Sequence, residues 1–97
     1  MIEEYITLET AKLLRINGFS DISYFPTQSI AQKWLRETKN LHISIIRNAC
    51  GYGHDICKAD NGTHITDGIF DGPNDGGQWN TYEEALEVGI HEALKLI

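Results

Sequence analysis

The sequence lacks the long apolar run that a membrane-spanning helix needs, roughly 18 or more consecutive residues. Its first ten residues, MIEEYITLET, carry acidic side chains where a signal peptide has its basic region. It has only two cysteines, Cys50 and Cys57, too few for the disulfide framework of a small secreted domain. We therefore expect a cytoplasmic protein without membrane contact, in which both thiols stay reduced.

Internal repeats, low-complexity tracts and linkers are missing too, so 97 residues with 41% hydrophobic side chains predict one domain over residues 1–97. Basic residues are few and unevenly placed. Residues 26–48 carry four against one acid, a net charge of +3, whereas residues 49–97 carry two against nine acids, a net charge of −7. Because nucleic-acid binding depends on phosphate neutralisation, the acidic half argues against a broad nucleic-acid surface.

Two helices are indicated in the first half of the chain. The first begins after Thr7, a good N-cap, and ends at Asn17-Gly18, a common helix C-terminus. The second opens at Pro26-Thr27 and runs through QSIAQKWLRETK, with one apolar face. That face consists of Ile30, Ala31, Trp34 and Leu35. The opposite, polar face consists of Gln28, Ser29, Gln32, Lys33, Arg36 and Lys39.

The last helix has the clearest signals. Thr81 and Glu84 form the T-x-x-E pattern of a capping box. An apolar stripe at helical spacing follows: Tyr82, Ala85, Leu86, Gly89, Ile90, Ala93, Leu94 and Ile97. Gly89 costs about 1 kcal/mol there relative to alanine, so we expect it to allow close approach of another backbone, that of the sheet.

Three short segments between the last two helices are typical of strands: LHISIIRN, GHDICKAD and THITDGIFD. The segment NACGYG and the pair Asn61-Gly62 are turn sequences between them. The sequence therefore predicts an α+β fold of order α-α-β-β-β-α, with a three-stranded antiparallel sheet packed on one face against the helices.

Cys50, His54, Cys57 and His64 form the densest group of potential metal ligands. Their spacings, x3, x2 and x6, match no common zinc site, because zinc ligands usually come in two tight pairs. The alternative is that both cysteines act as small apolar residues and both histidines lie on a sheet surface. No pattern places a nucleophile, a base and an orienting group together. We therefore expect a non-enzymatic protein without a metal or another cofactor.

Nucleic-acid binding has two forms to consider. The order α-β-β-β-α over residues 27–97 is that of a double-stranded-RNA-binding domain, but Glu83 and Glu84 stand where such domains carry lysines. The second form is a winged-helix-like DNA-binding protein. It would read the major groove with the basic face of residues 28–39 and would use residues 41–58 as its wing. The alternative is a solvated basic face that balances the acidic half.

Protein binding is the function that we expect, with nucleic acid as the less favoured partner. We predict Gln32, Lys33 and Arg36 as the contact residues. An exposed apolar contact patch, formed by Phe70, Trp79 and Val88, is the other hypothesis; these side chains could also simply cover the edge of the core. The partner is either another protein or a second copy of the chain in a homodimer.

Three segments, ITLETAKLLRINGF, PTQSIAQKWLRE and TYEEALEVGIHEALKLI, resemble a group of short, functionally uncharacterised proteins of bacterial prophages and mobile elements. The resemblance covers nearly half of the chain and brings no activity, substrate or catalytic residue with it. It implies a cytoplasmic accessory protein and favours contact with a host or phage protein over a metabolic role. Cys50, His54, Cys57 and His64 all lie outside the three segments.

Overall fold

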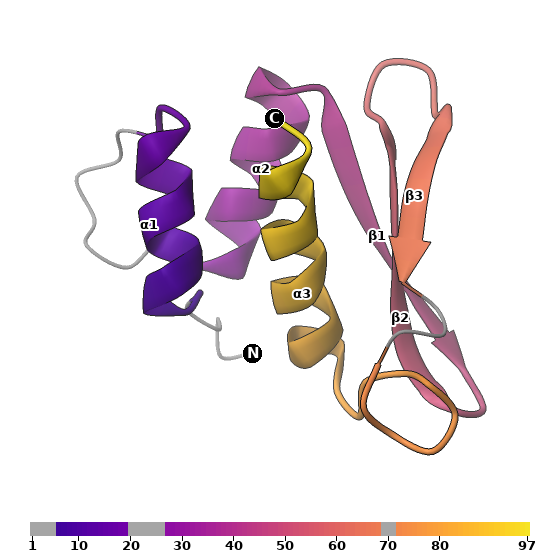
Figure 1. Cartoon of the computed structure of the whole chain (residues 1–97). Coiled ribbons are helices and arrows are strands. Elements are labelled where there is room, and N and C mark those ends of the chain that lie inside the picture. The colour runs from indigo at the N-terminus through magenta and orange to yellow at the C-terminus, as the bar shows by residue number, and fades with distance from the viewer. Residues whose placement is uncertain (1–5, 20–26, 69–71) are drawn as a thin grey trace.

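The computed structural model of the chain describes residues 6–19, 27–68 and 72–97. In these ranges its helices are α1 (Leu8–Ile16), α2 (Gln28–Thr38) and α3 (Tyr82–Lys95), and its strands are β1 (Leu41–Asn48), β2 (Gly51–Lys58) and β3 (His64–Gly68) (Figure 1). The order α-α-β-β-β-α and the antiparallel pairing of the strands confirm the predicted α+β fold.

The elements form three layers. The sheet has the order β1-β2-β3, with β2 in the middle. Helix α3 packs across β1 and β2, α2 packs beside α3 against β1, and α1 packs on α3 as the outermost layer (Figure 1). The helices therefore cover one face of the sheet, the inner face, as predicted, and no described helix covers the other, outer face. None of the described helices is long and apolar enough to cross a membrane.

Strand alternation decides which side chains enter the core. Ile43 of β1 and Ile56 of β2 are register partners, and both are buried beneath the helices. The residues between the buried positions point the other way. On the outer face His42 stands opposite Cys57, and Ser44 stands opposite Asp55. The sheet thus has an apolar side and a polar side, as is common for antiparallel sheets.

Helix α3 begins as predicted. The hydroxyl of Thr81 accepts a hydrogen bond from the Glu84 N–H at 3.1 Å and donates one to the Glu84 carboxylate at 3.0 Å. The apolar stripe is buried from Ala85 to Leu94, but the prediction was wrong at both ends. Tyr82 is 44% exposed and Ile97 is 49% exposed, because one lies in the first turn and the other beyond the last.

The caps allow a direct test of what holds α3. We expect Thr81→Ala to lower the free energy of unfolding by about 1 kcal/mol, because the Glu84 N–H loses its acceptor. Thr38→Ala is the matched control, since Thr38 is exposed in the last turn of α2 and caps no helix start. Urea unfolding followed by circular dichroism should show a change within about 0.5 kcal/mol for the control. Equal losses in both variants would contradict the role of the cap.

Gly89 does permit a close approach of α3 to the sheet. A Cβ atom at this position would lie 3.0 Å from Ile43 Cγ2 and 3.2 Å from His54 Cβ. The atoms approached therefore belong to side chains of β1 and β2, rather than to their backbone as we expected. A larger residue at position 89 would collide with the Ile43 and His54 side chains and would force α3 away from β1 and β2.

Candidate functional site

The predicted contact residues on α2 have different roles in the structure. Gln32 is half-buried, and its Nε2 atom donates a 2.8 Å hydrogen bond to the carbonyl oxygen of Ile43. Lys33 is exposed and Arg36 is half-buried, and neither forms an ion pair with a described residue. Two of the three residues are therefore cations without an ion-pair partner among the described residues, while the third attaches α2 to β1.

Gln28 was predicted on the polar face but is only 6% exposed. Its Nε2 atom donates a 2.7 Å hydrogen bond to the carbonyl oxygen of Glu83, which joins the first turns of α2 and α3. The available polar face of α2 is therefore smaller than the sequence pattern suggested.

The packing of α1 differs from that of a winged-helix protein. Helix α1 packs principally on α3, whereas the support helix of a winged-helix protein packs against the recognition helix.

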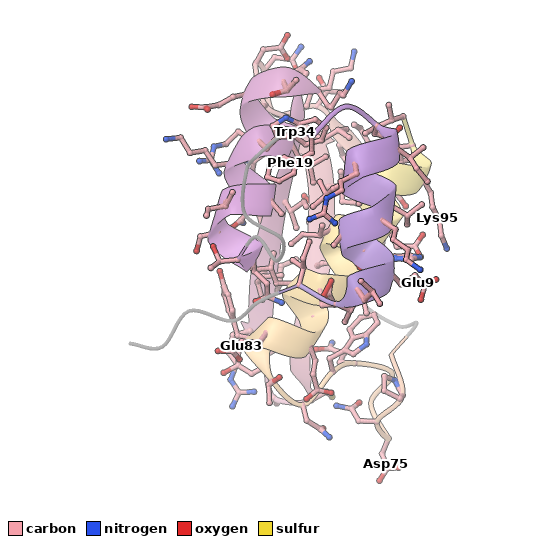
Figure 2. The ribbon with its side chains drawn as sticks, turned by 90° about the vertical axis from the view of Figure 1, so that its left-hand side faces the viewer. Glu9, Phe19, Trp34, Asp75, Glu83 and Lys95 are labelled. Atoms are coloured by element: carbon pink, nitrogen blue, oxygen red, sulfur yellow. The ribbon has the colours of Figure 1, made fainter. Side chains whose placement is uncertain are left out.

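Trp34 packs against the core at the border of the exposed side of α2. Its ring is half-buried and meets the Phe19 ring edge-on, with centroids 5.5 Å apart, and the Lys39 Nζ atom lies 5.6 Å from its centroid (Figure 2). Ile30, which we placed on the apolar face, is 40% exposed. Helix α2 therefore presents apolar surface next to its cations.

Strand alternation separates the four candidate metal ligands of the sequence. His54 is 3% exposed on the inner face beneath α3, whereas Cys57 and His64 are neighbours on the outer face. Cys50 lies in the β1–β2 turn, where Gly76 packs against its side chain. Both cysteines are free thiols. One ion cannot be bound by all four residues.

A different group of ligands does come together on the outer face. His64 Nε2 lies 3.1 Å from Asp55 Oδ1 and 3.2 Å from Asp67 Oδ2. The three donor atoms lie within 4.8 Å of one another. Asp55 and Asp67 are register partners on β2 and β3, so the two carboxylates face each other across the strands. Sequence analysis missed this triad, which we refer to as the Asp55–His64–Asp67 cluster.

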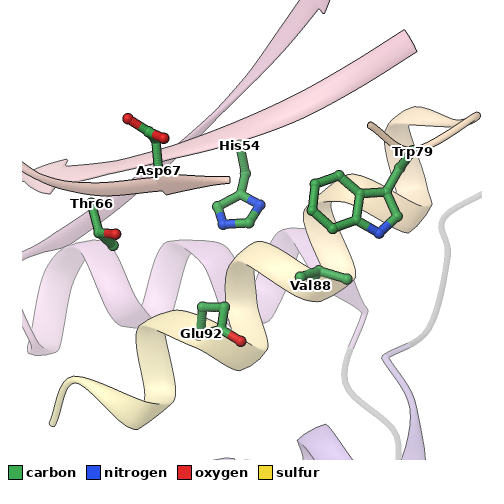
Figure 3. A pocket seen from close by; sticks show the side chains of 6 residues that line it. All are labelled: His54, Thr66, Asp67, Trp79, Val88 and Glu92. Carbon is green, nitrogen blue, oxygen red and sulfur yellow. The ribbon is translucent and has the colours of Figure 1, made fainter. Parts of the chain in front are cut away.

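A cleft of about 320 Å³ lies between the sheet and the middle of α3 (Figure 3). His54 and Thr66 point from the sheet toward α3, and Trp79, Val88 and Glu92 complete the lining, whereas Asp67 points away from the helix. His54 and Trp79 contact each other, with ring centroids 5.5 Å apart. The cleft combines an apolar wall with an imidazole and a carboxylate.

Trp79 does not form the exposed apolar patch that we considered, because it is only 7% exposed. Its N–H and carbonyl pair with the carbonyl and N–H of Tyr52 at 3.0 and 2.8 Å, which attaches the loop over residues 72–80 to the end of β2. Val88 is half-buried, and Phe70 lies outside the described residues. The alternative, in which Trp79 covers the edge of the core, fits its burial.

Comparison with models of protein families, with curated proteins and with solved structures found no match to this chain.

Proposed function

We propose that this protein is a small, non-enzymatic binding module that contacts a partner protein through the outward side of α2. The observation that carries this proposal is the pair Lys33 and Arg36. The two cations lie one turn apart and are unpaired among the described residues, and the opposite side of the same helix is fixed in the core.

The neighbouring apolar groups favour a protein partner. Ile30 is 40% exposed, and the half-buried Trp34 ring packs against the core with Lys39 over its face. Tryptophan and arginine are enriched where protein interfaces gain most of their binding energy. A surface that combines cations, an aromatic ring and an aliphatic side chain suits an acidic patch with an apolar centre on the partner. The resemblance to short, functionally uncharacterised proteins of prophages and mobile elements, which implies an accessory role, favours the same class of function.

The charge distribution makes duplex DNA the less favoured partner. Glu83 and Asp75 lie at the end of the molecule away from Trp34 (Figure 2), and the net charge of the chain is −6. With Gln28 and Gln32 engaged inside the molecule, the α2 surface offers two or three cations to phosphates. A contact of this size gives a logarithmic salt slope of only about −2 to −3. DNA binding is therefore the alternative that the experiment must distinguish from protein binding.

The test is a pull-down from host lysate with the double variant Lys33→Glu and Arg36→Glu. We expect the variant to lose its partner, because two attractive contacts become repulsive, which amounts to at least a tenfold weaker affinity, or about 1.4 kcal/mol. The control is Lys12→Glu with Lys58→Glu, two exposed lysines on α1 and β2. Both double variants have the same net charge, so a loss confined to the α2 variant identifies the surface.

Three outcomes would count against the proposal. Equal retention of the partner by the wild-type protein and the α2 variant would show that this face is only solvated surface. Equal loss in the control variant would point to net charge instead of a site. Recovery that disappears after nuclease treatment, together with binding of duplex DNA by the purified protein that weakens as the salt concentration rises, would favour the DNA-binding alternative. Circular dichroism of each variant must first show the wild-type fold.

A further inference from the structure

The outer face of the sheet carries a donor arrangement that the proposed function does not use. Asp55 of β2 and Asp67 of β3 stand directly opposite each other, and the imidazole of His64 lies between their carboxylates. Like charges in directly opposed cross-strand positions destabilise a sheet unless a cation neutralises them. The cluster therefore concentrates negative charge where the sheet gains from a bound cation.

His64 alone cannot satisfy both carboxylates. Its Nε2 atom lies at nearly the same distance, 3.1 and 3.2 Å, from one oxygen of each aspartate. An imidazole nitrogen carries at most one hydrogen, whether the ring is neutral or protonated, so one N–H must be shared between two acceptors. A metal ion bound to the nitrogen lone pair accepts electron density from all three groups at once.

The distances fit a metal coordination sphere. Bonds of about 2.0 Å in a tetrahedral site place neighbouring ligand atoms roughly 3.3 Å apart. The separations of 3.1 and 3.2 Å between His64 Nε2 and the two carboxylates are close to this value, and all three donor atoms lie within 4.8 Å of one another. We propose that Asp55, His64 and Asp67 bind one divalent transition-metal ion, with Zn²⁺ as the expected occupant and water at the remaining position.

The strand geometry supports this assignment. His64 and Asp67 are three residues apart, and in a regular strand they would point to opposite faces of the sheet. An irregularity in the β2–β3 pairing at Ile56 and Cys57 changes the register, so that His64 and Asp67 reach the same side. Irregularities of this kind re-aim side chains and are frequent next to functional sites.

Other potential metal ligands lie next to the cluster, so an experiment can test which side chains bind the ion. Cys57 stands opposite both His42 and His64 on the outer face, so its thiolate is the competing ligand. A site of one imidazole and two carboxylates suits Zn²⁺, Mn²⁺ or Co²⁺, whereas participation of a thiolate would give a softer site. Binding at the Asp55–His64–Asp67 cluster would join β3, an outer strand of the sheet, to the central β2.

The experiment uses the whole chain without a histidine tag, freed of metal by chelation. Calorimetric titration with ZnCl₂ should show one bound equivalent, and the thermal midpoint of unfolding should rise with the Zn²⁺ concentration. His64→Gln and Asp67→Asn should each weaken binding at least about tenfold. His42→Gln, Cys57→Ser and Asp60→Asn are the matched controls, and they should keep the wild-type affinity.

Spectroscopy locates the ion independently of affinity. With Co²⁺ as the probe, we expect ligand-field bands of an oxygen and nitrogen site without a thiolate charge-transfer band. Line broadening of amide signals should centre on residues 55, 64 and 67. Absence of saturable binding, undiminished binding in folded His64→Gln, or a thiolate band that disappears with Cys57→Ser would each overturn the proposal.

Discussion

Gly51→Ala is expected to lower the free energy of unfolding by about 3 kcal/mol or more, a large part of the stability of a small domain. Gly51 has a φ of 140°, a region that residues with a Cβ atom rarely adopt. An added Cβ would also overlap the carbonyl oxygen of Trp79, which accepts a hydrogen bond from the Tyr52 N–H. The substitution therefore combines backbone strain with detachment of the 72–80 loop.

Gly62→Ala is the comparison for a glycine at positive φ whose added Cβ would contact no atom. Gly62 also has a positive φ, 76°, but nothing lies within 4 Å of the position that its Cβ would take. Only the cost of the left-handed conformation remains, about 1 kcal/mol. Chemical unfolding of both variants measures the difference. If Gly51→Ala lowered the free energy of unfolding no more than Gly62→Ala does, the overlap between the added Cβ and Trp79 would not destabilise the protein. If Gly51→Ala were neutral, the turn would have to adopt another conformation.

Ile56→Ala is the second substitution with a large expected effect. Ile56 is fully buried at the centre of β2, and its loss removes apolar contacts and leaves a cavity beneath the helices. Such truncations cost roughly 2–5 kcal/mol. Ile46→Ala is the matched control, because Ile46 lies on the outer face and is 37% exposed. We expect it to cost less than about 1 kcal/mol.

This pair of isoleucine variants also tests which face of the sheet is solvated. Unfolding in urea gives both free energies, and the slope of the transition shows whether either variant changes the surface exposed on unfolding. A loss at Ile46 as large as that at Ile56 would mean that something covers the outer face. Equal small losses would place the core elsewhere than between the sheet and the helices.

The helices were predictable because their signals are local. Thr7, Thr27 and Thr81 each cap a helix start in the structure, and Asn17 caps the end of α1. The three strands were predicted from their β-rich composition, although β2 begins at Gly51, inside the segment NACGYG that was predicted as a turn. Asn61-Gly62 does lie in the β2–β3 connection, although this loop spans residues 59–63 and is longer than a two-residue turn. The length of this loop depends on which residues of β2 and β3 pair, and turn propensity alone does not specify that pairing.

The candidate site was harder to predict, for a physical reason. Strict alternation places His64 and Asp67 on opposite faces, and only the irregular pairing with β2 brings them together. Alternation does show that His54 and Cys57 cannot share a face, since they are three positions apart, an odd spacing. The sequence thus argues against the zinc group built from its cysteines, but it contains no local signal for the Asp55–His64–Asp67 cluster.

Helix periodicity placed Ala31 and Leu35 correctly in the core, but it missed the exposure of Ile30 and the hydrogen bonds of the two glutamines. Gln28 and Gln32 fall on the polar side by spacing, yet both reach carbonyl oxygens of other elements. A glutamine has a long side chain with an amide donor at its end, so it can satisfy a distant backbone group while its Cα lies at the boundary of the core. Periodicity predicts on which side of the helix a side chain leaves the backbone, but it does not predict the position of the terminal amide.

The Gln32 amide has a consequence for self-association. Strand β1 is an edge strand of the sheet. Edge strands offer unpaired backbone groups to strands of other molecules. Because the carbonyl of Ile43 already accepts a hydrogen bond from Gln32, a foreign strand must displace a side chain to pair at this point. A glutamine anchored on the packed helix thus makes the β1 edge less available to a foreign strand at Ile43.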